Sequence, residues 1–174
     1  MAIQNIEIKA RTSNQDAIRQ LLIEHHAEAK GTDHQVDTYF RVANGRLKLR
    51  EGNIENNLIH YRRDNQEGPK LSDITLYPCK PDSPLKELLT KALGVLTVVE
   101  KKREIYFIDN VKFHLDTVAT LGGFVEIEAI DDDGSIGRDQ LRKQCEYFMS
   151  LFGIAKEDLI SSSYSDMLLK MRIV

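Results

Sequence analysis

The chain has 174 residues, of which 41% are hydrophobic and 29% charged, and its formal net charge is −3. These proportions are ordinary for a soluble globular protein of one domain, which we expect to span residues 1–174. The charge argues against a nucleic-acid binder, and no apolar run approaches the roughly 20 residues of a membrane-spanning helix. Cys79 and Cys145 are too few for a disulfide framework, and residues 1–9 show no apolar targeting segment, so we expect a cytoplasmic protein.

Eight segments have the patterns of β-strands. In the first, Ile6 and Ile8 alternate with polar residues, so that the two kinds of side chain lie on opposite faces. Asn44-Gly45 predicts a two-residue hairpin between the second and third strands, and Asp109-Asn110 joins the sixth to the seventh. The predicted strands cover residues 3–11, 36–42, 46–51, 57–63, 72–79, 97–108, 111–117 and 123–130.

Apolar residues at i, i+3 and i+4 predict the helices. The first begins after Ser13 or Asn14, the second lies within residues 83–94, the third covers 138–153, and a last turn or two covers 164–170. Short connections between consecutive strands favour an antiparallel sheet, and eight such strands can close into a barrel that has no free edges. We therefore predict an α+β, mainly β fold: a closed eight-stranded antiparallel barrel with the helices packed outside.

Charged residues recur on one face of most of the predicted strands. They are Glu7, Lys9 and Arg11; Arg46, Lys48 and Arg50; His60 and Arg62; Lys101 and Arg103; Lys112, His114 and Asp116; and Glu126 and Glu128. Two interpretations are open. The charges can form a solvated outer face, which is common in antiparallel sheets. Alternatively, the apolar helix faces cover the outside of the barrel, and the charges point into a wet interior where they are matched by one another or by a ligand.

The mixture of cations and carboxylates indicates what a charged interior could bind. Arg and Lys side chains bind phosphate oxygens, but carboxylates alone would repel phosphate. A pair such as Glu126 and Glu128 is explained by Mg²⁺ or Mn²⁺, which takes oxygen ligands and bridges to substrate phosphates. Cations together with a metal-binding carboxylate pair are typical of phosphoryl or nucleotidyl transfer.

Six blocks of the chain occur in the order typical of one family. NIEIKA is similar to an E-x-E-x-K signature, GRLKLRE to a Leu-Arg-Ile-Arg strand, and LIHYRRDNQEGPKLSD to a segment with a Lys and a Gly-Pro turn. VVEKKREIY is similar to V-x-K-x-R-x-x-Y, FHLDTVATLGGFVEIEAI to L-D-x-V-x-x-L-G-x-F-x-E-x-E, and SSYSDMLL to a C-terminal segment. On these blocks the sequence resembles CYTH-domain proteins, which include CyaB-type (class IV) adenylate cyclases and thiamine triphosphatases.

The resemblance implies a triphosphate-tunnel barrel whose charged lumen holds a triphosphate and Mg²⁺ or Mn²⁺. Glu7 and Lys9 would belong to the catalytic machinery. The implied metal ligands are Glu7, Glu126, Glu128 and Asp116. The implied triphosphate-binding residues are Lys9, Lys48, Arg50, Arg62, Lys70, Lys101 and Arg103. The chain departs from the signature at Asn5, where an amide, which can offer an oxygen but no charge, replaces the first acid.

The resemblance implies a metal-dependent enzyme that is class IV adenylate cyclase-like and converts ATP to cyclic AMP and pyrophosphate. Two alternatives stay open. One is a triphosphatase that hydrolyses thiamine triphosphate, inorganic triphosphate or a nucleoside triphosphate, and the other is a non-catalytic module that binds polyphosphate or nucleotide. The expected partner is the small-molecule triphosphate, with a homodimer as a possibility from the family, and no nucleic acid or membrane is expected.

Overall fold

The structure is a computed structural model that describes residues 3–63 and 66–172. In chain order its elements are β1 (Ile3–Arg11), α1 (Gln15–Glu24), β2 (Glu28–Phe40), β3 (Arg46–Glu51), β4 (Asn57–Arg63), β5 (Lys70–Pro78), α2 (Leu85–Leu93), β6 (Val95–Ile108), β7 (Val111–Val118), β8 (Gly122–Asp131), α3 (Arg138–Leu151), a 3₁₀ turn (Lys156–Asp158) and α4 (Tyr164–Met171). None of these helices is long and apolar enough to cross a membrane.

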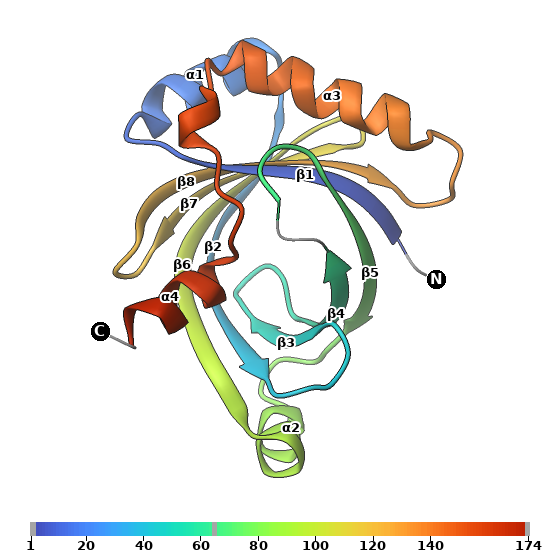
Figure 1. Ribbon diagram of the computed structural model, residues 1–174, viewed down its shortest axis with the longest axis vertical. Coiled ribbons are helices and arrows are strands. Elements are labelled where there is room, and N and C mark those ends of the chain that lie inside the picture. Colours follow the sequence, from blue (N-terminus) through green and yellow to red (C-terminus); the bar gives the residue numbers. More distant parts are fainter. Residues whose placement is uncertain (1–2, 64–65, 173–174) are drawn as a thin grey trace.

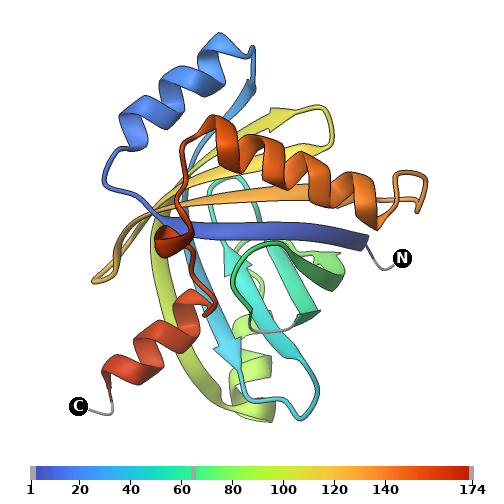
Figure 2. The same ribbon diagram turned by 45° about the horizontal axis from the view of Figure 1, so that its top comes forward.

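The strands form the closed antiparallel barrel that the sequence predicts. Their order is β1-β5-β4-β3-β2-β6-β7-β8, and β8 pairs back onto β1. Figure 1 shows α1 and α3 lying over β1, β7 and β8, while α4 lies beside β6 and α2 lies at the opposite tip of the barrel. The same arrangement is seen after rotation in Figure 2. Helices α1 and α3 therefore cover the outside of the barrel, as expected.

The outer core explains why the charged faces point inward. Apolar residues of β1, β7 and β8, such as Ile8, Phe113 and Ile127, are buried beneath α1 and α3. The ring of Phe113 packs edge-on against that of Phe148 in α3, with 4.7 Å between ring centroids. Burial of each large apolar side chain contributes about 1.5–3 kcal/mol. Because strand residues alternate between faces, the charged residues of these strands must face the lumen, which excludes the solvated-face interpretation here.

Strand β2 differs from its predicted range, since it begins at Glu28 rather than at residue 36. Residues 28–35 lack an apolar alternation because their outward side chains are in solvent and two of their inward positions are the buried polar residues Asp33 and Gln35. The extra length pairs with β6 and carries a bulge between Ala29 and Gly31. The long strand brings polar side chains into the barrel that the sequence pattern did not reveal.

The two predicted hairpin turns have different outcomes. Asp109 and Asn110 form the expected tight connection between β6 and β7, with Asp109 in the left-handed region at φ 50°. The connection of β2 to β3 instead occupies residues 41–45, so the prediction of a two-residue hairpin is wrong there. Gly45 is still required at φ 64°, because a Cβ atom at this position would lie 2.7 Å from the carbonyl oxygen of Tyr61.

Candidate functional site

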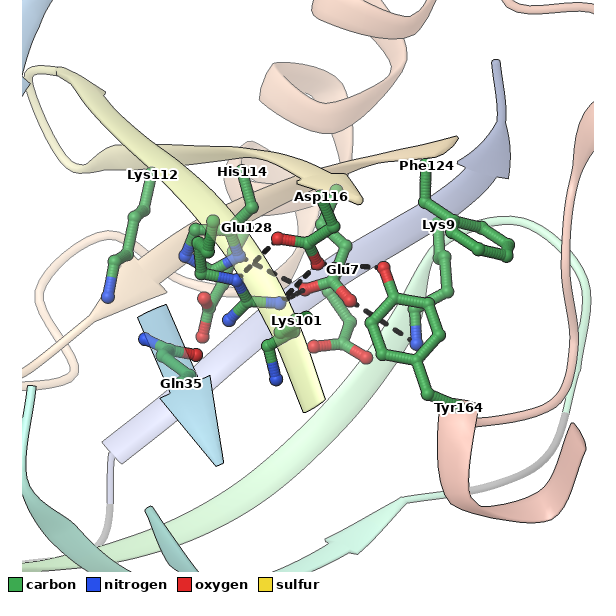
Figure 3. A network of polar contacts seen from close by, with 12 residues as sticks. Glu7, Lys9, Gln35, Lys101, Lys112, His114, Asp116, Phe124, Glu128 and Tyr164 are labelled. Atoms are coloured by element: carbon green, nitrogen blue, oxygen red, sulfur yellow. Dashed lines mark hydrogen bonds and ion pairs between the residues drawn. The ribbon is translucent and has the colours of Figure 1, made fainter. Parts of the chain in front are cut away.

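The interior of the barrel contains a cavity of about 270 Å³. Its walls include most of the residues that the sequence analysis singled out. These are Glu7, Lys9, Lys48, Arg50, Lys101, Arg103, Glu126 and Glu128. Figure 3 shows part of this network, in which side chains of the neighbouring strands β6, β7, β8 and β1 and the ring of Tyr164 gather on one side of the barrel. The barrel thus brings together residues from four strands that are far apart in the sequence.

One wall of the lumen is cationic and is organised around Asp37 of β2. This carboxylate is completely buried and accepts from Lys48 (2.8 Å) and Lys101 (2.9 Å) as well as from two nitrogens of Arg50 (both 2.9 Å). Burial alone would raise the pKa of Asp37, but Arg50, Lys101 and Lys48 hold it well below its usual value. Arg50 also contacts Glu55, of the loop between β3 and β4, at 2.9 Å, so that three cationic side chains contact two carboxylates on this wall.

Arg103 of β6 extends this wall and is fixed in orientation. Its Nε and Nη2 atoms donate to the two oxygens of Asp116 at 2.7 and 2.6 Å, and the Tyr164 hydroxyl donates to the same carboxylate at 2.8 Å. Asp116 is completely buried and is not among the residues that line the cavity. The structure therefore gives Asp116 a different place from the one expected of a metal ligand: it positions Arg103.

The facing wall is acidic and comes from β1 and β8. Glu7 lies opposite Glu128 in the strand register, and Lys9 lies opposite Glu126. Glu126 contacts the ammonium group of Lys9 (3.3 Å), Nη2 of Arg103 (3.3 Å) and Nδ1 of His114 (3.0 Å). The lumen is thus divided: Lys48, Arg50, Lys101 and Arg103 come from β3 and β6, whereas Glu7, Glu126 and Glu128 come from β1 and β8.

The acidic wall offers oxygen atoms that can bind a divalent cation. Glu7 pairs with Arg63, and Glu128 accepts from the amide nitrogen of Asn5, whose own Oδ1 is buried without a partner. Within residues 3–63 and 66–172, no group of three or more His, Cys, Asp or Glu side chains forms a ready-made metal cluster. Mg²⁺ usually binds through one or two carboxylates together with phosphate oxygens and water. Carboxylates on one wall and an unused amide oxygen beside them fit that donor set.

Two predicted phosphate-binding residues lie elsewhere. The expected lumen position of Arg62 is wrong: Arg62 is exposed on the outside of β4, and Arg63 lines the cavity in its place. Lys70 is buried but does not line the cavity; its ammonium group donates to the carbonyl oxygens of Ile160 (3.2 Å) and Ser161 (2.8 Å). Burial, together with Arg63 and Lys9, lowers the pKa of Lys70 to about 8. Lys70 therefore anchors the segment that leads into α4.

The structure also adds a residue that closes one end of the lumen. Tyr164, the first residue of α4, is buried inside the barrel against the ring of Phe124, with 4.9 Å between centroids. The Lys9 ammonium group lies 3.9 Å from the centre of the Tyr164 ring, a cation–π distance. Tyr164 joins Tyr39, Tyr61, Val99 and Phe124 in an apolar cluster at this end. The block SSYSDMLL contained the only sequence signal for this role.

Part of the cavity wall is apolar. Ile59 of β4, Ile74 and Leu76 of β5 and Ile130 of β8 line the cavity together with the charged residues. Ile59 is buried, whereas Leu76 is 42% exposed. The lumen can therefore contact an apolar or aromatic group that is attached to a bound anion, at a place that is open to solvent.

The chain is thus defined as a closed antiparallel barrel whose lumen carries both cationic and acidic side chains. Within this class the chain belongs to the CYTH domain family, whose model matches residues 4–164. This confirms the family resemblance of the sequence. A comparison with curated proteins finds no match.

Solved structures from several organisms share the fold. PH1012 of Pyrococcus horikoshii is 24% identical with a TM-score of 0.73, and a conserved hypothetical protein of Pyrococcus furiosus is 20% identical with a TM-score of 0.78; each comparison covers 93% of this chain and 98% of the other. A Vibrio parahaemolyticus protein proposed to be an adenylate cyclase is 21% identical, with a TM-score of 0.70 and coverage of 94% and 97%. At these identities the likeness supports the fold alone.

Proposed function

We propose that the protein is a metal-dependent enzyme that binds a triphosphate compound in the barrel lumen. The division of the lumen carries this proposal. On one wall Lys48, Arg50 and Lys101 share the carboxylate of Asp37, and Arg50 also pairs with Glu55, so that three cationic side chains contact two carboxylates and can accept a further anion. On the other wall lie the carboxylates that a phosphate alone would repel. A triphosphate with a divalent cation satisfies both walls at once.

Each residue has a role in this proposal that follows from its contacts. The phosphate oxygens would be bound by Lys48, Arg50 and Lys101. Arg103 is held in place by the contacts of its Nε and Nη2 atoms with Asp116, and its Nη1 atom would align the phosphates. Lys9 would neutralise charge between Glu126 and the phosphates, supported by the face of Tyr164. Such groups are in place before the reaction, so that little reorganisation is needed when charge develops.

Glu7, Glu126 and Glu128 would hold Mg²⁺ or Mn²⁺, with the Asn5 oxygen beside them. When bound, the cation would supply charge neutralisation and polarisation of the phosphorus–oxygen bonds. Asp116 is left out of this set because Arg103 and Tyr164 already occupy its oxygens.

The reaction we propose is class IV adenylate cyclase-like. The ribose 3′ hydroxyl attacks the α-phosphorus of ATP and releases its proton to solvent, the bond from the α-phosphorus to the bridging oxygen breaks, and pyrophosphate leaves. The apolar wall of Ile59, Ile74 and Ile130 favours a triphosphate that carries an organic group, because inorganic triphosphate has nothing to place there.

A triphosphatase is the second candidate. In that reaction water attacks the terminal phosphorus, the bond from this phosphorus to its bridging oxygen breaks, and orthophosphate and the diphosphate compound are released. Leu76 in the apolar part of the wall is 42% exposed, so the organic group of a substrate would not be enclosed there. This favours a triphosphatase, because hydrolysis requires only that the phosphates are bound. A Hippeastrum protein that shares the fold at 15% identity is described as having a dominant triphosphatase activity.

A product assay separates these reactions. The purified protein is incubated with Mg²⁺ or Mn²⁺ and, separately, with ATP, thiamine triphosphate and inorganic triphosphate, and the products are resolved by chromatography. E128Q is the test variant, and E51Q, an exposed carboxylate outside the lumen that pairs with Lys86, is the matched control. Cyclic AMP with pyrophosphate, lost in E128Q only, supports the cyclase, and orthophosphate without a cyclic product supports the triphosphatase. Binding of triphosphates without turnover would refute both enzymes and leave a non-catalytic binding module.

A further inference from the structure

Glu55 is an acid that lies on the cationic side of the lumen. It comes from the loop between β3 and β4 and lines the cavity. Its Oε2 accepts from Nη1 of Arg50 at 2.9 Å, and its Oε1 accepts from the ammonium group of Lys112 in β7. Burial alone would raise the pKa of Glu55, but Arg50 and Lys112 hold it well below its usual value, so the group is a carboxylate at neutral pH. One protein carboxylate therefore binds two lumen cations in the way a phosphate group would.

The loop that carries Glu55 is held in place by a buried carboxylate. Asp33 of β2 is completely buried and accepts from the backbone N–H groups of Ile54 (2.9 Å) and Glu55 (3.0 Å). Gln35 donates to Asp33 at 2.8 Å and to Glu55 at 3.2 Å. A Cβ atom at Gly52 would lie 2.5 Å from Asp33 Oδ1, so the close fit of the loop requires glycine there. The position of the Glu55 carboxylate is therefore fixed by the fold and is not that of a freely moving surface group.

Glu55 and Tyr164 mark opposite ends of the row of lumen cations. Figure 3 shows Lys112, the partner of Glu55, at one end of the drawn network and Tyr164 at the other. Lys101 lies between them, and Lys48 and Arg50 meet it at Asp37. A phosphate chain that lies along these cations meets the Tyr164 ring in one direction and a fixed carboxylate in the other. Placing a further phosphate against that carboxylate would bring like charges together.

We propose that Glu55 is a specificity-determining residue that limits the length of the phosphate chain. The lumen accepts a triphosphate, and Glu55 occupies Arg50 and Lys112, the cations to which a longer linear polyphosphate would have to bind. This inference rests on the proposed function, because it assumes that the lumen binds phosphates. It adds a chain-length limit set by a residue of the loop between β3 and β4, outside the strands that supply the other charged residues of the lumen.

The experiment measures the affinities of inorganic tripolyphosphate and tetrapolyphosphate by isothermal titration calorimetry, in EDTA so that no metal-dependent turnover occurs. The proteins are the wild type, E55Q, E55D and the control E51Q, each checked for folding by its thermal transition. We expect the wild type and E51Q to prefer tripolyphosphate, and E55Q to gain roughly tenfold in affinity for tetrapolyphosphate while its affinity for tripolyphosphate changes less than about threefold. E55D retains the charge and should retain the preference.

The outcomes separate this inference from the proposed function. If E55Q changes the affinities for tripolyphosphate and tetrapolyphosphate by the same factor, the charge of Glu55 acts on any anion in the lumen. That result would overturn the length limit and leave the proposed function standing. Weaker binding of both chains in E55Q would show that Glu55 only positions Arg50 and Lys112, which also overturns it. A folded wild type that binds neither chain in EDTA, and that neither binds nor hydrolyses either chain when the titration is repeated with Mg²⁺, would overturn the proposed function, and the inference with it.

Discussion

Replacement of Asp37 by Asn tests the charge balance of the lumen most directly. Each of the three cations lies 2.8–2.9 Å from an Asp37 oxygen, and at an effective dielectric constant of about 20 each such pair is worth about 6 kcal/mol before desolvation. The cost of burying the carboxylate and the mutual repulsion of the cations offset most of this sum. Breaking a buried ion pair by removing one partner typically costs about 3–5 kcal/mol, so we expect D37N to lose about 4 kcal/mol of unfolding free energy.

The assay is thermal unfolding followed by circular dichroism at neutral pH in a phosphate-free buffer. For a chain of this size, a loss of about 4 kcal/mol lowers the Tm by roughly 12 °C. D73N is the matched control, because Asp73 is exposed on the outside of β5, and it should change the unfolding free energy by less than about 0.5 kcal/mol. Tripolyphosphate should raise the Tm of D37N more than that of the wild type, since it supplies the missing negative charge. A loss in D37N as small as that in D73N would refute the reasoning.

Three further predictions concern single residues. R63A should weaken tripolyphosphate binding about tenfold in calorimetry and R62A less than about twofold, because only Arg63 lines the cavity; equal losses would contradict the assignment. The pKa of Lys70 in the folded protein, about 8, lies below its ordinary value of 10.5. Between these two pH values the unfolded chain binds more protons than the folded protein, so the stability of the folded protein rises with pH. In urea titrations, the unfolding free energy of the wild type relative to that of K70M should therefore rise by about 1–2 kcal/mol from pH 8 to pH 10.5. Burial raises the pKa of the Cys145 thiol to about 12. A thiol reagent at pH 8 should therefore modify Cys79 quickly and Cys145 only when the protein unfolds, and rapid modification of both thiols in the folded protein would contradict this.

The sequence predicts the barrel well because its strands repeat one simple pattern. Strands β1, β7 and β8 have one apolar and one charged face, and only one orientation buries the apolar face under the helices. The same alternation places Glu7, Lys9, Glu126 and Glu128 in the lumen, and that placement is confirmed. Where the alternation is clear, both the strand and its inward residues can be read from the sequence.

The pattern fails where both faces of a strand carry similar residues. In β4, Leu58, His60 and Arg62 alternate with Ile59, Tyr61 and Arg63, so periodicity cannot decide which arginine faces the lumen. A shift of one residue moves every side chain to the other face. The family resemblance implies Arg62 as the lumen residue, and the alternation in β4 gives no means of correcting it to Arg63.

Other residues of the site are not revealed by the periodicity of a strand or helix. Glu55 lies in a loop, and its position depends on the buried carboxylate of Asp33 in a strand whose first part shows no apolar alternation. Tyr164 enters the barrel because α4 folds back across its end, which is a tertiary effect. These positions depend on contacts between segments that are far apart in the sequence, and patterns within a segment cannot show them.

The acidic wall has a consequence for how a cation would bind. Asn5 is neutral where the family signature has an acid, and its amide group donates to Glu128. Glu7 and Glu126 are likewise paired with Arg63 and Lys9. A free divalent cation would have to break these contacts and then face the guanidinium and ammonium groups across the lumen. A cation that arrives already bound to a triphosphate brings the charge that occupies those groups, so the wall is suited to a metal–triphosphate complex rather than to the metal alone.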